Sequence, residues 1–293
     1  MKHAILGAGA IGGLLGTAFA SLGEDVTMVV RAGKLASYPA NLTLERPSGS
    51  LTAPAKAVAA LTTPIDVLWI ATKTYQLESA LAAVKSLPGC VVPLLNGVDH
   101  VAALRSQFGH DRVVPATIAI EAERLAPGLF IQRSAVVRFN LAASGEPLLG
   151  AIVEEMAPLG FSSRFIANEL TLLWAKLCFL GPFALVTSAS SMNAGEILAD
   201  AAWNRKLTTA IAEACAVSNA SGAEIDTAQI QAILASSPPG MRSSMQKDVA
   251  AGRELELDAI GGPIVRGGER YGIDVSTTAE LIAAIRARIS TAA

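Results

Sequence analysis

Short apolar runs alternate with amphipathic stretches through the first half of the chain. Four apolar runs predict strands at Ala4–Leu6, Asp25–Val30, Val67–Ala71 and Cys90–Leu95. Apolar residues spaced three and four positions apart predict helices at Ile11–Leu22, Gln76–Ser86 and Glu146–Leu159. Strands that alternate with helices form a parallel sheet covered on both faces, so the first half is predicted to be an α/β domain.

Two regions break this alternation. Residues Leu42–Thr52 have β character around the turn Pro47–Ser50, and Thr117–Leu141 alternates apolar and polar residues around Pro127-Gly128. Turn residues between two β-like runs are typical of hairpins. We therefore expect antiparallel additions to the parallel sheet in both regions, with Ser162–Ile166 as a closing strand.

The pattern changes after Asn168, where strand signals nearly vanish. The predicted helices of the second half are Leu170–Thr187, Asn193–Ser221, Thr227–Ala235, Leu257–Tyr271 and Thr277–Ile289. Asn168 is a suitable N-cap for the first of them, because its side chain can accept a hydrogen bond from the first helical turn. We predict an α/β domain of residues 1–167 and an all-α domain of residues 168–293.

Composition narrows the class of protein. The chain has 293 residues, of which 52% are hydrophobic, and a formal net charge of −2. Its length favours two folded domains, and its near-neutral charge disfavours nucleic-acid binding. The three cysteines are too few and too scattered for a disulfide framework, and no two of the three histidines have metal-ligand spacing, so no metal site is expected.

The most apolar segment, Leu170–Ala189, contains Lys176 and Gly181-Pro182. A membrane-spanning helix needs about 20 apolar residues with few charges, so we predict a buried core helix and no membrane partner. A cytoplasmic protein is the corresponding expectation. The apolar helices of the second half leave a homodimer interface open, although the same residues could equally form the core.

Six residues match the dinucleotide-binding pattern GxGxxG, namely Gly7, Ala8, Gly9, Ala10, Ile11 and Gly12. The pattern directly follows the strand Ala4–Leu6 and opens the next helix, as such a turn requires. The glycines there allow a tight bend, close approach of a pyrophosphate and helix packing, while the helix N-terminus attracts the anion. We predict a Rossmann-type dinucleotide-binding domain; the alternative is a glycine-rich turn without a ligand.

The end of the second strand bears on the choice between NAD and NADP. An NAD site usually carries an acidic residue there, whereas this strand runs into Arg31. Glu24 and Asp25 lie at the opposite end of the strand. A guanidinium can form a bidentate contact with a 2′-phosphate, so we predict NADPH/NADP as the cofactor. The alternative is an ordinary surface arginine.

Lys176 lies in an apolar helix, on a face shared with Leu172, Leu180 and Phe183. Burial of a lysine disfavours the ammonium form and lowers its pKa, which would make it a proton donor near neutral pH. The alternative is a side chain that extends along its apolar stem to the surface.

Polar residues also follow two strands of the predicted sheet. Thr72 and Lys73 end the strand Val67–Ala71, and Asn96 follows the next strand. Ligands of a doubly wound sheet bind outside the carboxyl ends of its strands, so these side chains are predicted to lie near the cofactor. Asn96-Gly97 is also a common turn dipeptide. By spacing alone, Glu256 and Asp258 are ordinary solvated charges.

Taken together, the sequence resembles the ketopantoate reductase (2-dehydropantoate 2-reductase) family over its whole length. The motifs that carry the resemblance are Gly7–Gly13 with Arg31, Ala71–Lys73, Leu94–Val98, Trp174–Leu177, Ser243–Met245, Asp248-Val249 and Glu256–Asp258. The resemblance implies an N-terminal Rossmann domain, a C-terminal helical domain with the active site between them, and NADPH-dependent reduction of ketopantoate to pantoate, on the route to pantothenate and coenzyme A.

The resemblance also implies roles for individual residues. Lys176 would be the general acid that protonates the substrate carbonyl. Glu256 would bind the substrate hydroxyl and orient Lys176, and Ser244 would contact the substrate carboxylate. Asn96 and Lys73 would line the nicotinamide and the substrate.

The sequence departs from the family pattern along the helix that carries Lys176. Leu180 and Ala184 occupy positions where the family usually has asparagine, and Ala194 occupies a third, with Asn193 as a candidate substitute. An apolar pocket discriminates weakly between polar substrates, so a more apolar 2-oxo acid or ketone is a second hypothesis. A catalytically silent NADPH-binding sensor is a third. Pro263 is expected to kink the helix that follows Glu256.

Overall fold

The computed structural model describes residues 1–292, so Ala293, the last residue of the predicted second domain, lies outside the described residues. Contacts within the chain define two compact units. The first comprises Met1–Leu95 and His100–Ala167, and the second comprises Asn96–Asp99 and the described residues from Asn168 onward. The four-residue segment Asn96–Asp99, which the sequence assigns to the first domain, therefore makes its contacts with the helical unit.

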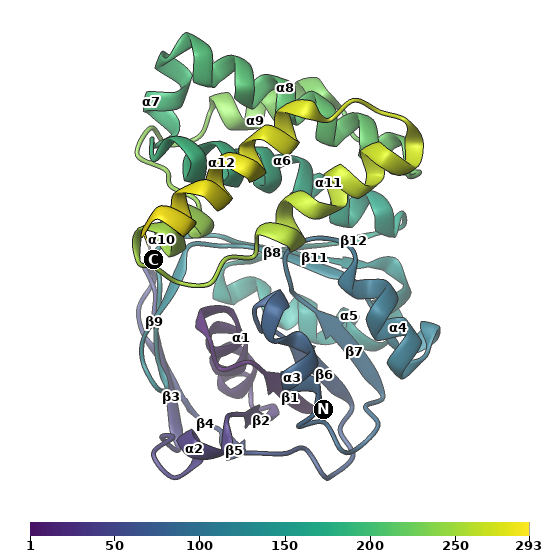
Figure 1. Ribbon diagram of the computed structural model, residues 1–293. Coiled ribbons are helices and arrows are strands. Elements are labelled where there is room, and N and C mark those ends of the chain that lie inside the picture. The colour runs from purple at the N-terminus through teal and green to yellow at the C-terminus, as the bar shows by residue number, and fades with distance from the viewer. Residues whose placement is uncertain (293) are drawn as a thin grey trace. The chain divides into compact units, whose positions relative to one another are not determined.

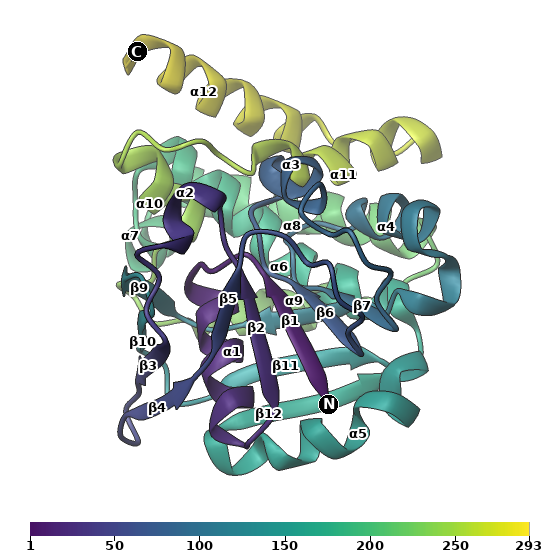
Figure 2. The ribbon, with the colours of Figure 1, turned by 90° about the horizontal axis from the view of Figure 1, so that it is seen from below.

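The first unit contains a five-stranded parallel sheet. Its strands are β1 (Lys2–Leu6), β2 (Asp25–Val29), β5 (Lys56–Val58), β6 (Val67–Ile70) and β7 (Cys90–Pro93). They lie in the order β5-β2-β1-β6-β7, as Figure 2 shows. The strand order reverses beside β1, and an α/β sheet of this kind binds its ligand outside the carboxyl ends of the strands at that point. The predicted Rossmann-type sheet is confirmed.

The helices of the first unit are α1 (Ala10–Ser21), α2 (Ala32–Leu35), α3 (Leu77–Leu81), α4 (His100–Phe108) and α5 (Glu146–Glu155), with 3-10 turns η1 (Thr74–Gln76), η2 (His110–Arg112), η3 (Ala143–Gly145) and η4 (Ala157–Leu159). The helix predicted over Gln76–Ser86 is wrong in its length. Its second half leaves the helix because Leu61 N donates to Ala83 O, and Lys85 N donates to Leu61 O. Backbone pairing with a distant residue therefore replaces the helical hydrogen bonds.

Both predicted hairpins form, but they do not join the parallel sheet. Strands β3 (Asn41–Glu45), β4 (Leu51–Pro54), β9 (Ala122–Ala126) and β10 (Leu129–Gln132) form a sheet of their own, in the order β4-β3-β10-β9. Strands β8 (Ala116–Ala119), β11 (Val137–Ala142) and β12 (Phe161–Ile166) form a third sheet. The prediction of additions to one sheet was wrong, because the four-stranded sheet packs over α1 instead.

The second unit is helical, as predicted. Its helices are α6 (Glu169–Ser190), α7 (Ala194–Ala199), α8 (Ala201–Ala220), α9 (Thr227–Ala235), α10 (Ser244–Ala250), α11 (Leu257–Tyr271) and α12 (Ser276–Ala292). Asn168 caps α6 by accepting a hydrogen bond from Thr171 N at 3.0 Å. The single helix predicted over Asn193–Ser221 is wrong: the Asp200 carboxylate caps a new helix, accepting from Ala202 N and Trp203 N. Helix α11 runs through Pro263.

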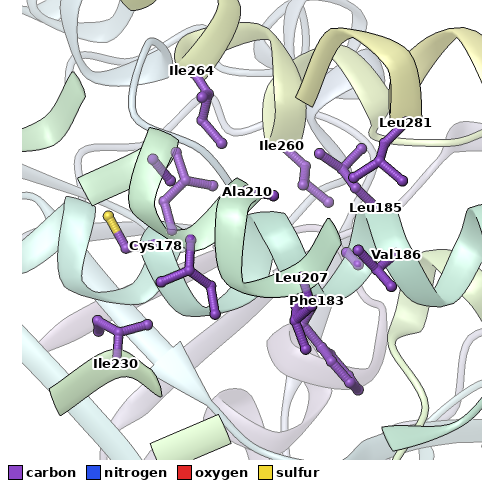
Figure 3. Close-up of a cluster of buried hydrophobic side chains, with 14 of the residues drawn as sticks. Cys178, Phe183, Leu185, Val186, Leu207, Ala210, Ile230, Ile260, Ile264 and Leu281 are labelled. Carbon is purple, nitrogen blue, oxygen red and sulfur yellow. The ribbon is translucent and has the colours of Figure 1, made fainter. Parts of the chain in front are cut away.

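Helix α6 forms the centre of the helical unit, packed against α8, α10, α11 and α12 (Figure 1). Its side chains Cys178, Phe183 and Leu185 lie in one apolar cluster with residues from α8, α9, α11 and α12 (Figure 3). Helix α6 is long and apolar enough to cross a membrane, but 67% of its most apolar window is buried within the fold. It therefore has the character of a core helix, which agrees with the prediction from the sequence.

Candidate active site

The glycine-rich turn joins β1 to α1 and is sterically confined. Gly7 has a φ of +107°, and a Cβ built there would lie 2.8 Å from the backbone of Ala71 and Thr72. A Cβ at Gly12 would lie 1.9 Å from the carbonyl oxygen of Gly7. Glycine is therefore required at both positions, at the first by a left-handed backbone conformation and at the second by a close approach within the turn.

The N-terminus of α1 is suited to bind an anion. Gly9 occupies the N-cap without a side-chain hydrogen bond, and the first turn has no acidic residue. A Cβ at Gly9 would meet no atom within 4 Å, so its backbone borders open space. Ala8, Ala10 and Ile11 complete the turn with small or apolar side chains that carry no competing charge. A dinucleotide pyrophosphate fits this combination of open space, free N–H groups and helix dipole.

Arg31 lies where β2 ends, and it occupies the N-cap position of the short helix α2 with an exposed side chain. Asp25 lies at the other end of β2, where its carboxylate pairs with Lys56 at 2.8 Å. The carboxyl end of β2 therefore presents a cation and the amino end an acid. A cation at the carboxyl end of this strand can contact a 2′-phosphate, whereas an acidic residue there would bind a free ribose 2′-hydroxyl.

The turn also has a cationic neighbour that the sequence analysis missed. Arg124 on β9 donates from Nη1 to the carbonyl oxygen of Ala8 at 3.2 Å. No local signal marks Arg124, because its position depends on the pairing of β9 in a separate sheet. Its guanidinium adds positive charge next to the backbone that would receive the pyrophosphate.

Thr72 and Lys73 follow β6, as predicted, and the Gly7 turn contacts the backbone just before them. The Oγ1 atom of Thr72 is buried with no hydrogen-bond partner among the described residues. Lys73 is half-buried at the N-cap position of η1. The structure thus brings this strand end to the glycine turn, and Thr72 offers a polar atom there that the protein itself leaves unsatisfied.

Three of the predicted site residues meet in the helical unit. Lys176 Nζ on α6 donates to Asn96 Oδ1 at 3.1 Å, and Asn96 Nδ2 donates to Glu256 Oε2 at 3.1 Å. Glu256 is buried and directly precedes α11. The Asn96 amide therefore links the two charged groups, with its oxygen toward the Lys176 ammonium and its nitrogen toward the Glu256 carboxylate. The sequence singled out all three residues, but not this arrangement.

Burial shifts the protonation equilibrium of Lys176. The Lys176 residue is half-buried, and burial of its amine lowers the pKa to about 8, because burial disfavours the charged form more strongly than the Glu256 carboxylate favours it. At pH 7, Lys176 is then protonated in about nine-tenths of the molecules. Lys176 is thus both charged and able to release a proton near neutral pH, which a general acid requires.

The helix face that follows Lys176 is apolar. Leu180 is half-buried and packs against the hydrophobic cluster, while Ala184 is fully buried. Beyond it, Thr187 Oγ1 lies 2.7 Å from the hydroxyl of Ser243, which caps α10. The first polar side chain along this face, Thr187, is thus about three turns beyond Lys176 and is already paired with Ser243.

Two predicted substrate residues lie at helix starts. Ser244 is the exposed first residue of α10, a helix that packs against α6. Asn193 caps α7 in a reciprocal arrangement: its Oδ1 accepts from Glu196 N at 3.0 Å, and Glu196 Oε2 accepts from Asn193 N at 2.8 Å. The oxygen of Asn193 is therefore used by the helix, and only its Nδ2 is left to contact a substrate.

Within the described residues, no group of three or more His, Cys, Asp or Glu side chains forms a metal site.

Comparison with known proteins identifies the family. A family model described as ketopantoate reductase PanE/ApbA matches residues 3–144, and the model of its C-terminal part matches residues 168–289. A 2-dehydropantoate 2-reductase of Caulobacter vibrioides is 30% identical, with 97% of this chain and 98% of that protein covered. The chain belongs to the ketopantoate reductase family. It is accordingly an oxidoreductase of the class that uses a nicotinamide dinucleotide, and the predicted family resemblance is confirmed.

Solved structures share the fold over nearly the whole chain. A ketopantoate reductase family protein from Ralstonia eutropha JMP134 superposes with a TM-score of 0.88 at 25% identity, and the alignment covers 99% of each chain. D-mandelate dehydrogenase, solved with NADH and anilino(oxo)acetate, superposes with a TM-score of 0.87 at 21% identity, again over 99% of each chain. At that identity, the second likeness shows the fold alone.

Proposed function

We propose that the chain is an NADPH-dependent reductase that converts ketopantoate (2-dehydropantoate) to pantoate, on the route to pantothenate and coenzyme A. The observation that carries the proposal is the hydrogen-bonded array of Lys176, Asn96 and Glu256, with the pKa of Lys176 lowered to about 8. Membership of the ketopantoate reductase family supports the choice of substrate.

In this proposal Lys176 is the general acid. When bound, the reduced nicotinamide supplies a hydride to the carbonyl carbon of the substrate. Lys176 Nζ donates its proton to the carbonyl oxygen, where negative charge develops. Asn96 directs the ammonium by accepting a hydrogen bond from it, and the carboxylate of Glu256 helps to keep the amine protonated until the substrate arrives.

The remaining site residues bind and orient. The Gly7–Gly12 turn holds the pyrophosphate, Arg31 contacts the 2′-phosphate, and Lys73 lines the nicotinamide side. Glu256 also accepts a hydrogen bond from the hydroxyl of ketopantoate. Ser244 contacts the substrate carboxylate, and Asn193 contributes its free Nδ2.

A second candidate keeps this mechanism and changes the substrate to a more apolar 2-oxo acid. The observation that favours it is Leu180, which is half-buried one turn beyond Lys176 on α6 and presents no hydrogen-bonding side chain, whereas Ala184 is fully buried and does not reach the site. An apolar side chain cannot satisfy the hydroxyl of a small polar substrate, but it accepts a larger hydrocarbon group.

Steady-state NADPH oxidation with a panel of ketones tests both candidates. The panel contains ketopantoate, its analogue without the hydroxyl, and an aliphatic and an aromatic 2-oxo acid. The proposal expects the highest kcat/KM with ketopantoate and a large loss with the analogue. Turnover of only the apolar 2-oxo acids would favour the second candidate. NADPH binding without turnover of any ketone would contradict both and indicate a sensor.

A further inference from the structure

Arg266 on α11 joins two carboxylates that come from separate segments of the helical unit. Its Nη2 donates to Asp99 Oδ2 at 2.6 Å, and its Nη1 donates to Asp258 Oδ1 at 2.8 Å. Asp99 belongs to the segment Asn96–Asp99, whereas Asp258 lies in the first turn of α11. One guanidinium therefore connects the segment that carries Asn96 to the helix that follows Glu256.

This contact depends on a glycine in the middle of the helix. Asp258, Gly262 and Arg266 lie at i, i+4 and i+8 on one face of α11, and eight residues of helix span about 12 Å. Arginine side chains on a helix point back toward its N-terminus. A Cβ at Gly262 would lie 2.6 Å from both Asp258 Oδ1 and Arg266 Nη1. The guanidinium thus reaches Asp258 across the space that a side chain at residue 262 would fill.

The segment Asn96–Asp99 lies directly on the backbone of the same helix. Gly97 has a φ of +83°, and a Cβ there would lie 2.2 Å from the carbonyl oxygen of Ala259. On one side of this close approach Asn96 bonds Glu256, and on the other side Asp99 bonds Arg266. The segment is therefore held at both ends along the first turns of α11, and its position sets the position of the Asn96 amide.

We propose that Arg266 is a positioning residue that holds the amide of Asn96 between Lys176 and Glu256 through its contact with Asp99. This inference rests on the proposed function of Lys176 as the general acid. The pair is half-exposed, with side-chain exposures of 50% for Arg266 and 58% for Asp99. Ion pairs between exposed side chains of this kind contribute little to stability. A displacement of a catalytic group by about 1 Å, in contrast, lowers a rate by up to about 10²-fold.

The test uses Arg266→Gln, with Arg270→Gln as the matched control. Arg270 is an exposed arginine on the last turn of the same helix, beside the ring of Tyr271. Arg266→Gln is expected to lower kcat about tenfold or more while NADPH affinity and the melting temperature stay close to those of the parent. Arg266→Lys retains one of the two contacts and is expected to recover part of the activity. Arg270→Gln is expected to behave as the parent does.

A double-mutant cycle separates positioning from a general structural effect. In an Asn96→Ala background, Arg266→Gln is expected to cause no further loss of kcat, because the amide that it positions is absent. Gly262→Ala is expected to reproduce the loss of kcat without loss of stability, since alanine is a better helix former than glycine. Parent-like kcat in Arg266→Gln, or effects that add fully with Asn96→Ala, would overturn the inference.

Failure of the inference is distinguishable from failure of the proposed function. If Lys176→Ala abolishes turnover and Arg266→Gln does not reduce it, only the positioning role is wrong. If Lys176→Ala is fully active, the proposed function itself is wrong. Amide hydrogen exchange gives a readout that needs no substrate: residues 97–99 are expected to exchange faster in Arg266→Gln and not in Arg270→Gln. Unchanged exchange would also overturn the inference.

Discussion

Removing the charge of Glu256 is expected to move the pH limit of catalysis. Lys176 must carry its proton to act as an acid, so kcat/KM is expected to fall as the pH rises through about 8. The Glu256 carboxylate raises the pKa of Lys176, against the effect of burial. Glu256→Gln keeps the shape of the side chain and removes that support. In this variant, the fall of kcat/KM on the alkaline side of its pH profile should therefore occur at lower pH.

The size of the shift follows from the geometry of the array. Two hydrogen bonds of 3.1 Å in series through one amide place Lys176 Nζ about 6–8 Å from Glu256 Oε2. At an effective dielectric constant of about 20, opposite unit charges at that separation attract by roughly 2–3 kcal/mol. That energy corresponds to about 1.5–2 pKa units, so the fall of kcat/KM is expected near pH 6–6.5 in the variant.

The assay measures kcat/KM for the ketone against pH at saturating NADPH. Glu254→Gln is the matched control, since Glu254 is an exposed carboxylate two residues before Glu256. Its profile is expected to coincide with that of the parent. If kcat/KM of Glu256→Gln still falls near pH 8 and only its maximum value changes, the electrostatic effect of Glu256 on Lys176 is refuted. A shift of equal size in Glu254→Gln would show that net charge acts on the profile.

Three further predictions follow from the described contacts. Lys176→Ala is expected to lower kcat by about 10²–10⁴-fold with NADPH affinity retained, as fluorescence titration would show; full turnover would exclude the general-acid role. Arg31→Ala is expected to weaken NADPH about tenfold or more and leave NADH unaffected, since a charged hydrogen bond contributes about 1.5–3 kcal/mol; an unchanged ratio of dissociation constants would contradict the NADPH assignment. His3 is buried, stacks on Phe19 and accepts from Trp69 Nε1 at 3.0 Å; burial lowers its pKa. The unfolded chain then takes up a proton that the folded state excludes, so the free energy of unfolding should decline as the pH falls below about 6.5. His3→Gln should flatten that decline in denaturant titrations, and an equally steep decline would argue against it.

The cofactor half of the site was largely predictable because its determinants are local. A strand, three glycines and a helix follow one another within a dozen residues, and the constraints at Gly7 and Gly12 arise within that stretch or at the adjacent strand end. The position of Arg31 was predictable for the same reason, since it lies two residues beyond the end of β2. The cap at Asn168 also acts within its own first helical turn.

What the sequence could not predict depends on contacts between distant segments. The break at Asp200 is an exception, because its carboxylate caps α8 within the first turn of that helix, and the prediction of a single helix followed the apolar spacing alone. Arg124 reaches the glycine turn only because β9 pairs with β10 in a separate sheet. Likewise, Asn96 could be placed at a strand end, but its contacts with Lys176 and Glu256 bridge 80 and 160 positions of the chain.

The grouping of Asn96–Asp99 with the helical unit limits how this enzyme can be divided. Its covalent neighbours on both sides, Leu95 and His100, belong to the Rossmann-type unit, so the polypeptide passes from one unit to the other three times. A recombinant fragment cut at residue 168 would carry Lys176 and Glu256 yet lack the amide that links them. A chimera that exchanges the C-terminal half among relatives must therefore also keep a matching segment Asn96–Asp99. Otherwise Lys176 and Glu256 lose the amide that contacts both of them.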